Sequence, residues 1–184
     1  MCKWLENHEY ILSGTEEKDS KQSNYYKKGG ISLGIHLGNG QINIATSIDK
    51  ETRYAANKTA GEKFLVENAK KPGVNVTESG LQYKIIYAGK GTIPTKSSSV
   101  KVNYIGYLID GTEVENSYKM GVPSIFKIDL TTKGFSEVFS MMPVGSKWEV
   151  YIPQELQYGD LGVSERIPPF STLIYEIEML EIVK

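Results

Sequence analysis

The chain has 184 residues, which is enough for one ordinary domain plus a smaller appendage. Hydrophobic residues make up 40% of the chain and aromatic residues 10%, so a packed core is expected and wholesale disorder is not. The net charge is −1 and no basic stripe occurs, which argues against a nucleic-acid partner. No apolar run approaches the roughly 18–20 residues that cross a bilayer, so no transmembrane segment is predicted.

The N-terminal sequence is compatible with more than one cellular compartment. The stretch MCKWLENHEY lacks the apolar core of a signal peptide, so the chain as written is expected to be soluble and cytoplasmic. Cys2 is the single cysteine, so no internal disulfide can form, which fits a reducing compartment. Two interpretations of Cys2 remain. It is either an ordinary exposed thiol or the first mature residue of a lipoprotein whose signal peptide has been removed, in the cell envelope or periplasm.

Residues 1–30 are polar and charge-mixed. Within them, Glu16–Asn24 is typical of a solvated loop or a disordered run. Apolar residues at Trp4, Leu5 and positions 11–12 could form one short amphipathic helical turn, and nothing else in this stretch predicts a core.

The next segment, residues 31–46, has the pattern of a β-hairpin. Isoleucine and leucine alternate with small or polar residues from Ile31 to Leu37 and again at Ile42 and Ile44, on either side of Gly38-Asn39-Gly40. A degraded helix is the competing interpretation, and the glycines in this stretch count against it.

Residues 49–71 are predicted to be a linker helix. Together with the polar tail and the hairpin, it makes up an N-terminal segment of residues 1–76. Asp49 can cap the helix, and Pro72-Gly73 ends it. The apolar face is narrow, so the helix is expected to be a linker, or to pack on a partner or on the hairpin before it. The segment could therefore hold two chains together as a homodimer.

After residue 76 the sequence is dominated by strands. Alternating runs begin at Leu81 and Ser99, Asp110-Gly111 marks a hairpin turn, and a helix is predicted over Phe135–Met142. The last run alternates apolar residues with glutamates, which suits a sheet with one solvated face. Residues 77–184 are therefore predicted to be an α+β domain in which about five antiparallel strands pack against one short helix.

Three ordered blocks of the chain resemble peptidyl-prolyl cis-trans isomerases of the FKBP type. GEKFLVENAKKPGVNVTESGLQYKII (61–86) is similar to the helix-to-domain junction of Mip-like, two-part bacterial members. VNYIGYLIDGTEVENSY (102–118) and MPVGSKWEVYIPQELQYGDLGVSERIPPFSTLIYEIEMLEI (142–182) are similar to the domain itself. The resemblance implies a bent antiparallel sheet wrapped around one short helix. Residues 1–60 resemble the family's N-terminal dimerisation module only vaguely, because that module is normally longer and helical.

The resemblance implies a folding helper that isomerises X–Pro bonds, with proline-containing polypeptides as partners and the macrolides tacrolimus and rapamycin as inhibitors. Such a site needs no metal, cofactor or nucleophile, because an apolar pocket that favours the twisted amide is sufficient. By resemblance, four residues are expected to be catalytic: Tyr158, Glu115, Tyr104 and Phe135. Six are expected to bind the substrate: Val114, Phe126, Thr131, Thr132, Ile167 and Tyr175. Tyr158 would donate its hydroxyl to a substrate carbonyl, and Phe135 would be the floor of the pocket.

Several of these residues differ from the usual family pattern. Val114 stands where the family has an aromatic residue, Glu115 where it has aspartate, and Phe135 where it has tryptophan. Thr131-Thr132 replaces a valine–isoleucine pair and adds polar groups to the floor. Each change weakens the preference for the transition state. Attenuated isomerase activity and weak macrolide binding are therefore expected.

Two other functions fit the same residues. The groove could bind peptides without turnover, as a non-catalytic chaperone or adaptor. Alternatively, the N-terminal segment could make the protein an assembly module that holds two isomerase domains together.

Overall fold

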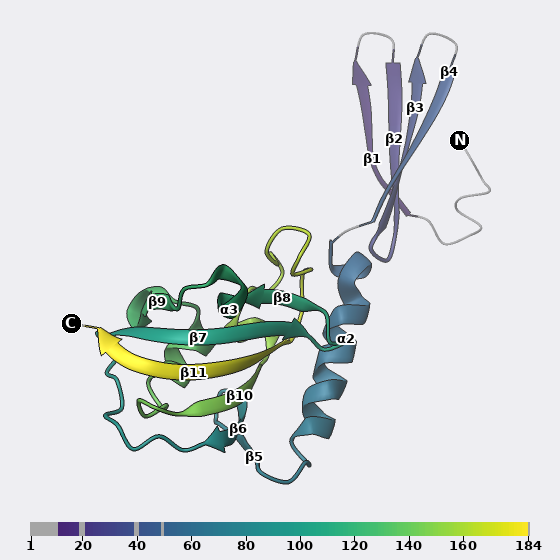
Figure 1. Ribbon diagram of the computed structural model, residues 1–184. Coiled ribbons are helices and arrows are strands. Elements are labelled where there is room, and N and C mark those ends of the chain that lie inside the picture. The colour runs from purple at the N-terminus through teal and green to yellow at the C-terminus, as the bar shows by residue number, and fades with distance from the viewer. Residues whose placement is uncertain (1–10, 19–20, 39–40, 49, 184) are drawn as a thin grey trace. The chain divides into compact units, whose positions relative to one another are not determined.

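The computed structural model describes residues 11–18, 21–38, 41–48 and 50–183. It divides the chain into two compact units, Met1–Ala55 and Ala56–Lys184, and each contains an antiparallel sheet (Figure 1). The predictions made for Cys2, for Trp4 and Leu5, and for Asp49 as a helix cap lie outside the described residues. None of the described helices is long and apolar enough to cross a membrane.

The N-terminal unit contains a four-stranded antiparallel sheet in the order β1-β2-β3-β4 (Figure 1). Its strands are β1 (Ile11–Lys18), β2 (Lys21–Lys28), β3 (Ile31–Gly38) and β4 (Gln41–Ile48). The alternating pattern of residues 31–46 corresponds to β3 and β4, which pair from Ile31↔Ile48 to Gly38↔Gln41. Tyr26 on β2 is buried, at 2% exposed.

The structure differs from the sequence interpretation between residues 11 and 28. The described part of Glu16–Asn24 lies in β1 and β2 instead of a loop, and Ile11 and Leu12 lie in β1 instead of a helical turn. Strand pairing uses backbone groups, so a polar segment without apolar alternation can still join an antiparallel ladder. The hydrophobic pattern therefore could not reveal these strands.

The C-terminal unit is built on a seven-stranded antiparallel sheet that curves around a short helix, α4 (Lys133–Phe139) (Figure 1). The strand order is β5-β6-β10-β11-β7-β8, with β9 paired to β7. The strands are β5 (Val74–Val76), β6 (Gln82–Tyr87), β7 (Ser99–Leu108), β8 (Glu113–Asn116), β9 (Ser124–Lys127), β10 (Lys147–Ile152) and β11 (Leu173–Val183). The predicted α+β fold, a bent antiparallel sheet around one short helix, is confirmed.

Short helical segments join the strands: α3 (Ser117–Met120), η1 (Ile128–Leu130) and η2 (Gln154–Leu156). Helix α4 starts two residues before the predicted Phe135 because Thr132 caps it, accepting a hydrogen bond from the Phe135 amide at 3.4 Å. Gly134 lets α4 approach the sheet closely, since a Cβ atom there would lie 2.5 Å from Ile152 Cγ2.

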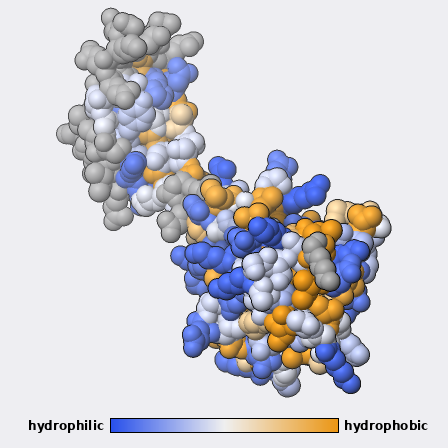
Figure 2. All heavy atoms as spheres, turned by 90° about the vertical axis from the view of Figure 1, so that its left-hand side faces the viewer, coloured by the Kyte–Doolittle hydropathy of each residue, from blue (hydrophilic) through white to orange (hydrophobic). Residues whose placement is uncertain are grey.

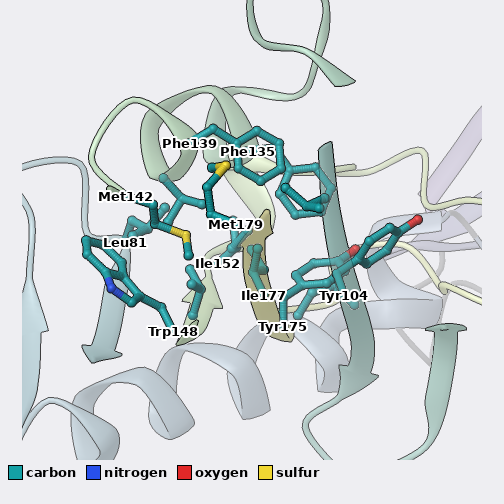
Figure 3. Packing of buried hydrophobic residues seen from close by; sticks show 14 of the residues in the cluster. Leu81, Tyr104, Phe135, Phe139, Met142, Trp148, Ile152, Tyr175, Ile177 and Met179 are labelled. Carbon is teal, nitrogen blue, oxygen red and sulfur yellow. The ribbon is translucent and has the colours of Figure 1, made fainter. Parts of the chain in front are cut away.

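The hydrophobic core of this unit lies between α4 and the sheet. Figure 3 shows Trp148 at one end of the core and Tyr104 and Tyr175 at the other, with Phe135 and Phe139 contributed by α4. Hydrophobic side chains also reach the surface among hydrophilic ones (Figure 2), and Leu130 and Leu161 are the most exposed of the large ones.

Helix α2 (Lys50–Asn68) crosses the division between the units, and from Asn57 onward it packs on the C-terminal one. Asn57 Nδ2 donates to the Pro169 carbonyl oxygen at 3.0 Å. The Phe64 ring lies 5.9 Å from that of Tyr151, whose neighbours in β10 point to the core on the opposite face. The helix therefore covers the face of the sheet that α4 does not.

The side of α2 that packs on the sheet is called its docking face. Gly61 and Asn68 on this face are buried. A side chain at Gly61 would collide with Thr172 on the sheet side. Asn68 Nδ2 donates to Gln82 Oε1 at 3.0 Å, and Gln82 Nε2 donates to the Leu65 carbonyl oxygen at 2.8 Å. The end of α2 is thus attached to β6 by buried hydrogen bonds.

We expect Asn68→Ala to lower the free energy of unfolding by about 1–3 kcal/mol, because it leaves the buried Gln82 Oε1 without its donor. Urea denaturation of the full chain measures this. Asn75→Ala is the matched control: Asn75 is exposed, and its side chain donates to the nearby Gly73 carbonyl oxygen at 3.4 Å. Its effect should stay within about 0.5 kcal/mol. Equal effects of the two substitutions would contradict the docking of α2.

Candidate functional site

An open cavity of about 510 Å³ lies at the tyrosine end of the core. Tyr104 comes from β7, and the loop between η2 and β11 adds Arg166 from the other side. The lining residues are Tyr104, Glu113, Val114, Glu115, Asn116, Lys119, Met120 and Arg166. The cavity thus has an aromatic and aliphatic wall with charged residues at its margin.

Four aromatic rings converge behind this cavity. The Tyr104 ring centroid lies 5.6 Å from that of Phe126, 6.2 Å from that of Phe135 and 6.1 Å from that of Tyr175. Phe135 and Tyr175 are closer still, at 4.7 Å. Such tilted and edge-on pairs are the favoured arrangements of aromatic side chains, and they give the cavity a rigid apolar base.

A chain of hydrogen bonds runs through the polar edge of the cluster. The Thr132 hydroxyl donates to Gln157 Oε1 at 2.6 Å, and Gln157 Nε2 donates to the Tyr175 hydroxyl at 3.4 Å. Tyr175 donates in turn to Glu115 Oε2 at 2.9 Å. These bonds connect the start of α4, the loop after η2, β11 and β8, so one network fixes the walls of the cavity.

Burial dominates the electrostatics of the site. It raises the pKa of Glu115 above the usual value, and the hydrogen bond from Tyr175 and the positive charge of Arg166 offset part of that rise. Burial, followed by the charge of Glu115, raises the pKa of Tyr158, Tyr104 and Tyr175 as well. All three phenols therefore keep their protons at neutral pH and can donate hydrogen bonds.

The structure brings most of the predicted site residues together. Tyr104, Val114 and Glu115 line the cavity, and Phe126, Phe135 and Tyr175 form its aromatic base. Ile167 is buried and Tyr158 half-buried against the same core. Thr132 is joined to the site through Gln157.

Thr131 is the exception among the predicted residues. It lines a separate depression with Thr77, Lys96 and Ser136. Its hydroxyl donates to the Ile128 carbonyl oxygen at 2.8 Å, so the turn before α4 uses this polar group internally.

Three residues of the site were missed by the sequence reasoning. Gln157 bridges Thr132 and Tyr175, Ser124 hydrogen bonds with Tyr104, and Arg166 lines the cavity. No local pattern marks these residues, because each reaches the site through a turn or a strand edge. Among the described residues, no group of three or more His, Cys, Asp or Glu side chains could hold a metal ion.

Two family profiles match the chain. Residues 90–180 match the profile described as FKBP-type peptidyl-prolyl cis-trans isomerase. Residues 34–85 match the profile of the domain amino terminal to that isomerase. The second match begins in β3, so β1 and β2 lie outside it.

Individual relatives agree with the profiles. The chain is 47% identical over 148 residues to the FKBP-type 22 kDa peptidyl-prolyl cis-trans isomerase of Escherichia coli, covering 80% of this chain and 72% of that one. It is 45% identical over 128 residues to the outer membrane protein MIP of Legionella longbeachae, covering 70% of this chain and 55% of that one. The crystal structure of FkpA from Escherichia coli superposes with a TM-score of 0.69 at 41% identity, covering 72% of this chain and 62% of that one.

The raised pKa of Glu115 leads to a test of the site's electrostatics. A carboxyl group with a higher pKa in the folded chain holds its proton more tightly there. Its contribution to stability is therefore present at low pH and is lost as the pH rises from about 4.3 through the folded pKa. We expect Glu115→Gln to remove this loss, so the variant should gain stability relative to wild type between pH 4 and pH 7.

Urea denaturation at several pH values in this range measures the effect. Glu67→Gln changes an exposed carboxyl group on α2 and serves as the control. A Glu115→Gln variant that loses stability relative to wild type as the pH rises would refute the interpretation.

Proposed function

The chain belongs to the family of FKBP-type peptidyl-prolyl cis-trans isomerases, and we propose that it catalyses cis/trans isomerisation of X–Pro bonds in proline-containing polypeptides. The observation that carries this proposal is the convergence of four aromatic rings beside the cavity that Tyr104, Val114 and Glu115 line. X–Pro exchange takes tens of seconds or more and limits the folding of many chains, so the protein would act as a folding helper.

The chemistry requires no covalent intermediate. Rotation about a peptide bond has a barrier of about 18–20 kcal/mol, because the amide resonance must be broken. The twisted amide has lost that resonance and part of its polarity. An apolar site therefore binds it more tightly than it binds the planar amide, and this difference in binding lowers the barrier.

In this proposal, Tyr104, Phe126, Tyr175 and Ile167 are the walls of the proline site and Phe135 is its floor. Tyr158 donates its hydroxyl to a substrate carbonyl; burial raises the pKa of this phenol, so it stays protonated at neutral pH. Glu115 is held by Tyr175 at the edge of the site. The Thr132 backbone N–H is a second donor, and Val114 is the remaining wall. Thr131 acts through the turn before α4, at a distance from the substrate.

We propose that activity is attenuated. Val114 gives a smaller wall than an aromatic residue would, and Phe135 gives a smaller floor than tryptophan, so less apolar surface contacts the twisted amide. Thr131 and Thr132 reduce the apolar character of the site less than their polarity suggests, since both hydroxyls are hydrogen bonded within the domain. The same loss of apolar surface would leave the macrolides tacrolimus and rapamycin weakly bound.

A proline-limited refolding assay with the full chain tests the proposal. Wild type should accelerate refolding, and Tyr158→Phe should lower kcat/KM about two- to ten-fold, the value of one hydrogen bond. Tyr87→Phe is the matched control, because Tyr87 is 63% exposed on β6 and lines none of the site. Val114→Phe should be faster than wild type if the missing wall limits the rate.

Each alternative has its own outcome in this assay. Saturable binding of a proline peptide without acceleration would favour the non-catalytic chaperone or adaptor. A rate typical of a strong isomerase, or tight tacrolimus binding, would contradict attenuation.

We also propose that the N-terminal unit joins two chains into a homodimer. Within the described sheet, β4 is an edge strand, and Ile42 and Ile44 on it are 68% and 66% exposed. Such an edge offers unpaired backbone groups together with apolar side chains, which favours pairing with another chain.

Light scattering of the full chain should therefore give twice the mass of one chain, and a chain that begins at Ala56 should be monomeric. Ile44→Lys should shift the full chain towards monomer, because a charge on an edge strand opposes pairing. Ile93→Lys, at an exposed position of the C-terminal unit, should not. A monomeric full chain at high concentration would end this proposal.

A further inference from the structure

Arg166 lines the cavity with a positive charge that acts on Glu115 without forming a salt bridge to it. The other cation there, Lys119, is held by Glu113, with Nζ 2.7 Å from Oε1. Within the described part of the chain, no salt bridge includes Arg166. The cavity thus has one guanidinium group at its margin that remains available to a ligand.

The backbone around Arg166 is fixed. Val163 and Ile167 form a β-bridge, in which the Val163 amide donates to the Ile167 carbonyl oxygen at 2.8 Å and the Ile167 amide donates back at 3.1 Å. The Arg166 amide donates to the Ser164 hydroxyl at 3.4 Å inside this turn. Ile167, the next residue, is only 2% exposed. The arginine is therefore presented to the cavity from a closed turn anchored in the core.

The carboxylate that Arg166 faces across the cavity is already engaged. Glu115 accepts the hydroxyl of buried Tyr175 at 2.9 Å, and this bond belongs to the network that fixes the walls. Arg166 is exposed while Glu115 is half-buried, and none of the salt bridges among the described residues joins the two. A carboxylate on a bound peptide can meet Arg166 without disturbing that network.

We propose that Arg166 is a specificity residue, which selects X–Pro segments that carry an aspartate or glutamate within about two residues of the proline. The proposal rests on the proposed isomerase function and names a substrate class for that site. The planar guanidinium can donate two parallel hydrogen bonds to one carboxylate. Because Arg166 is exposed, the selectivity should be modest, about two- to five-fold in kcat/KM, and it should fall as salt is added.

The test uses the full chain and pairs of proline peptides that differ only by glutamate or glutamine, placed in turn at each of the two positions before and after the proline. The measured quantity is the glutamate-to-glutamine ratio of kcat/KM at low and high salt. Wild type should favour glutamate at one position or more. Arg166→Gln should bring the ratio to about one, and Arg166→Lys should restore part of it.

Lys90→Gln is the matched control, because it removes the same charge from an exposed position outside the cavity and should leave the ratio unchanged. A wild-type ratio of one at every position, or a preference that survives Arg166→Gln, overturns the inference while leaving the isomerase function intact. If wild type isomerises none of the peptides, the proposed function fails instead. The dissociation constants of the same peptide pairs, measured by titration, then decide the role of Arg166.

Discussion

The C-terminal unit depends on the burial of one tyrosine whose hydroxyl group still finds partners. Tyr175 lies near the start of β11 and is fully buried, with its ring against Phe135. The strand beside it makes room, because a Cβ atom at Gly106 would lie 2.6 Å from the Tyr175 ring. A buried phenol without a hydrogen bond would be costly, and Glu115 and Gln157 remove that cost.

Core and site are consequently the same set of side chains at this end of the sheet. Phe135 at the start of α4, which stabilises the fold, also packs against Tyr104 and Tyr175 beside the cavity. The hydrogen bonds from Thr132 through Gln157 and Tyr175 to Glu115 extend this coupling to three further segments. A change in any of them alters the shape of the cavity as well as stability, so activity measurements need a stability measurement beside them.

Much of the fold could be predicted from the sequence, because alternation, turn residues and ordered family blocks all indicate the same α+β sheet. The aromatic residues of the site could be placed by resemblance. The positions of Gln157 and Arg166 beside the cavity could not, since they arise from how a turn folds back onto the sheet. Glu16–Asn24 was misinterpreted because its polar side chains carry no apolar alternation.

The packing of α2 on the sheet could not be predicted from the sequence, for a related reason. The helix was expected to be a linker, or to pack on a partner or on the hairpin before it, because its apolar face is narrow and asparagines make several of the contacts. Asn57 and Asn68 act through hydrogen bonds, and Gly61 acts through the absence of a side chain. Polar and small residues thus form much of the interface between α2 and the sheet, and an apolar pattern in the sequence does not predict it.

This stretch of α2 tolerates substitutions at its exposed positions far better than changes in length. Asn57, Gly61, Phe64 and Asn68 recur every three or four residues, so they lie on one side of α2. Exposed neighbours such as Glu62 and Glu67 can vary without touching the sheet. A single inserted residue between Asn57 and Asn68 would instead turn the rest of the helix by about 100° and replace Gly61 or Asn68 with a side chain that does not fit. The number of residues between the contact positions of α2 is therefore constrained, even though the exposed residues between them can vary.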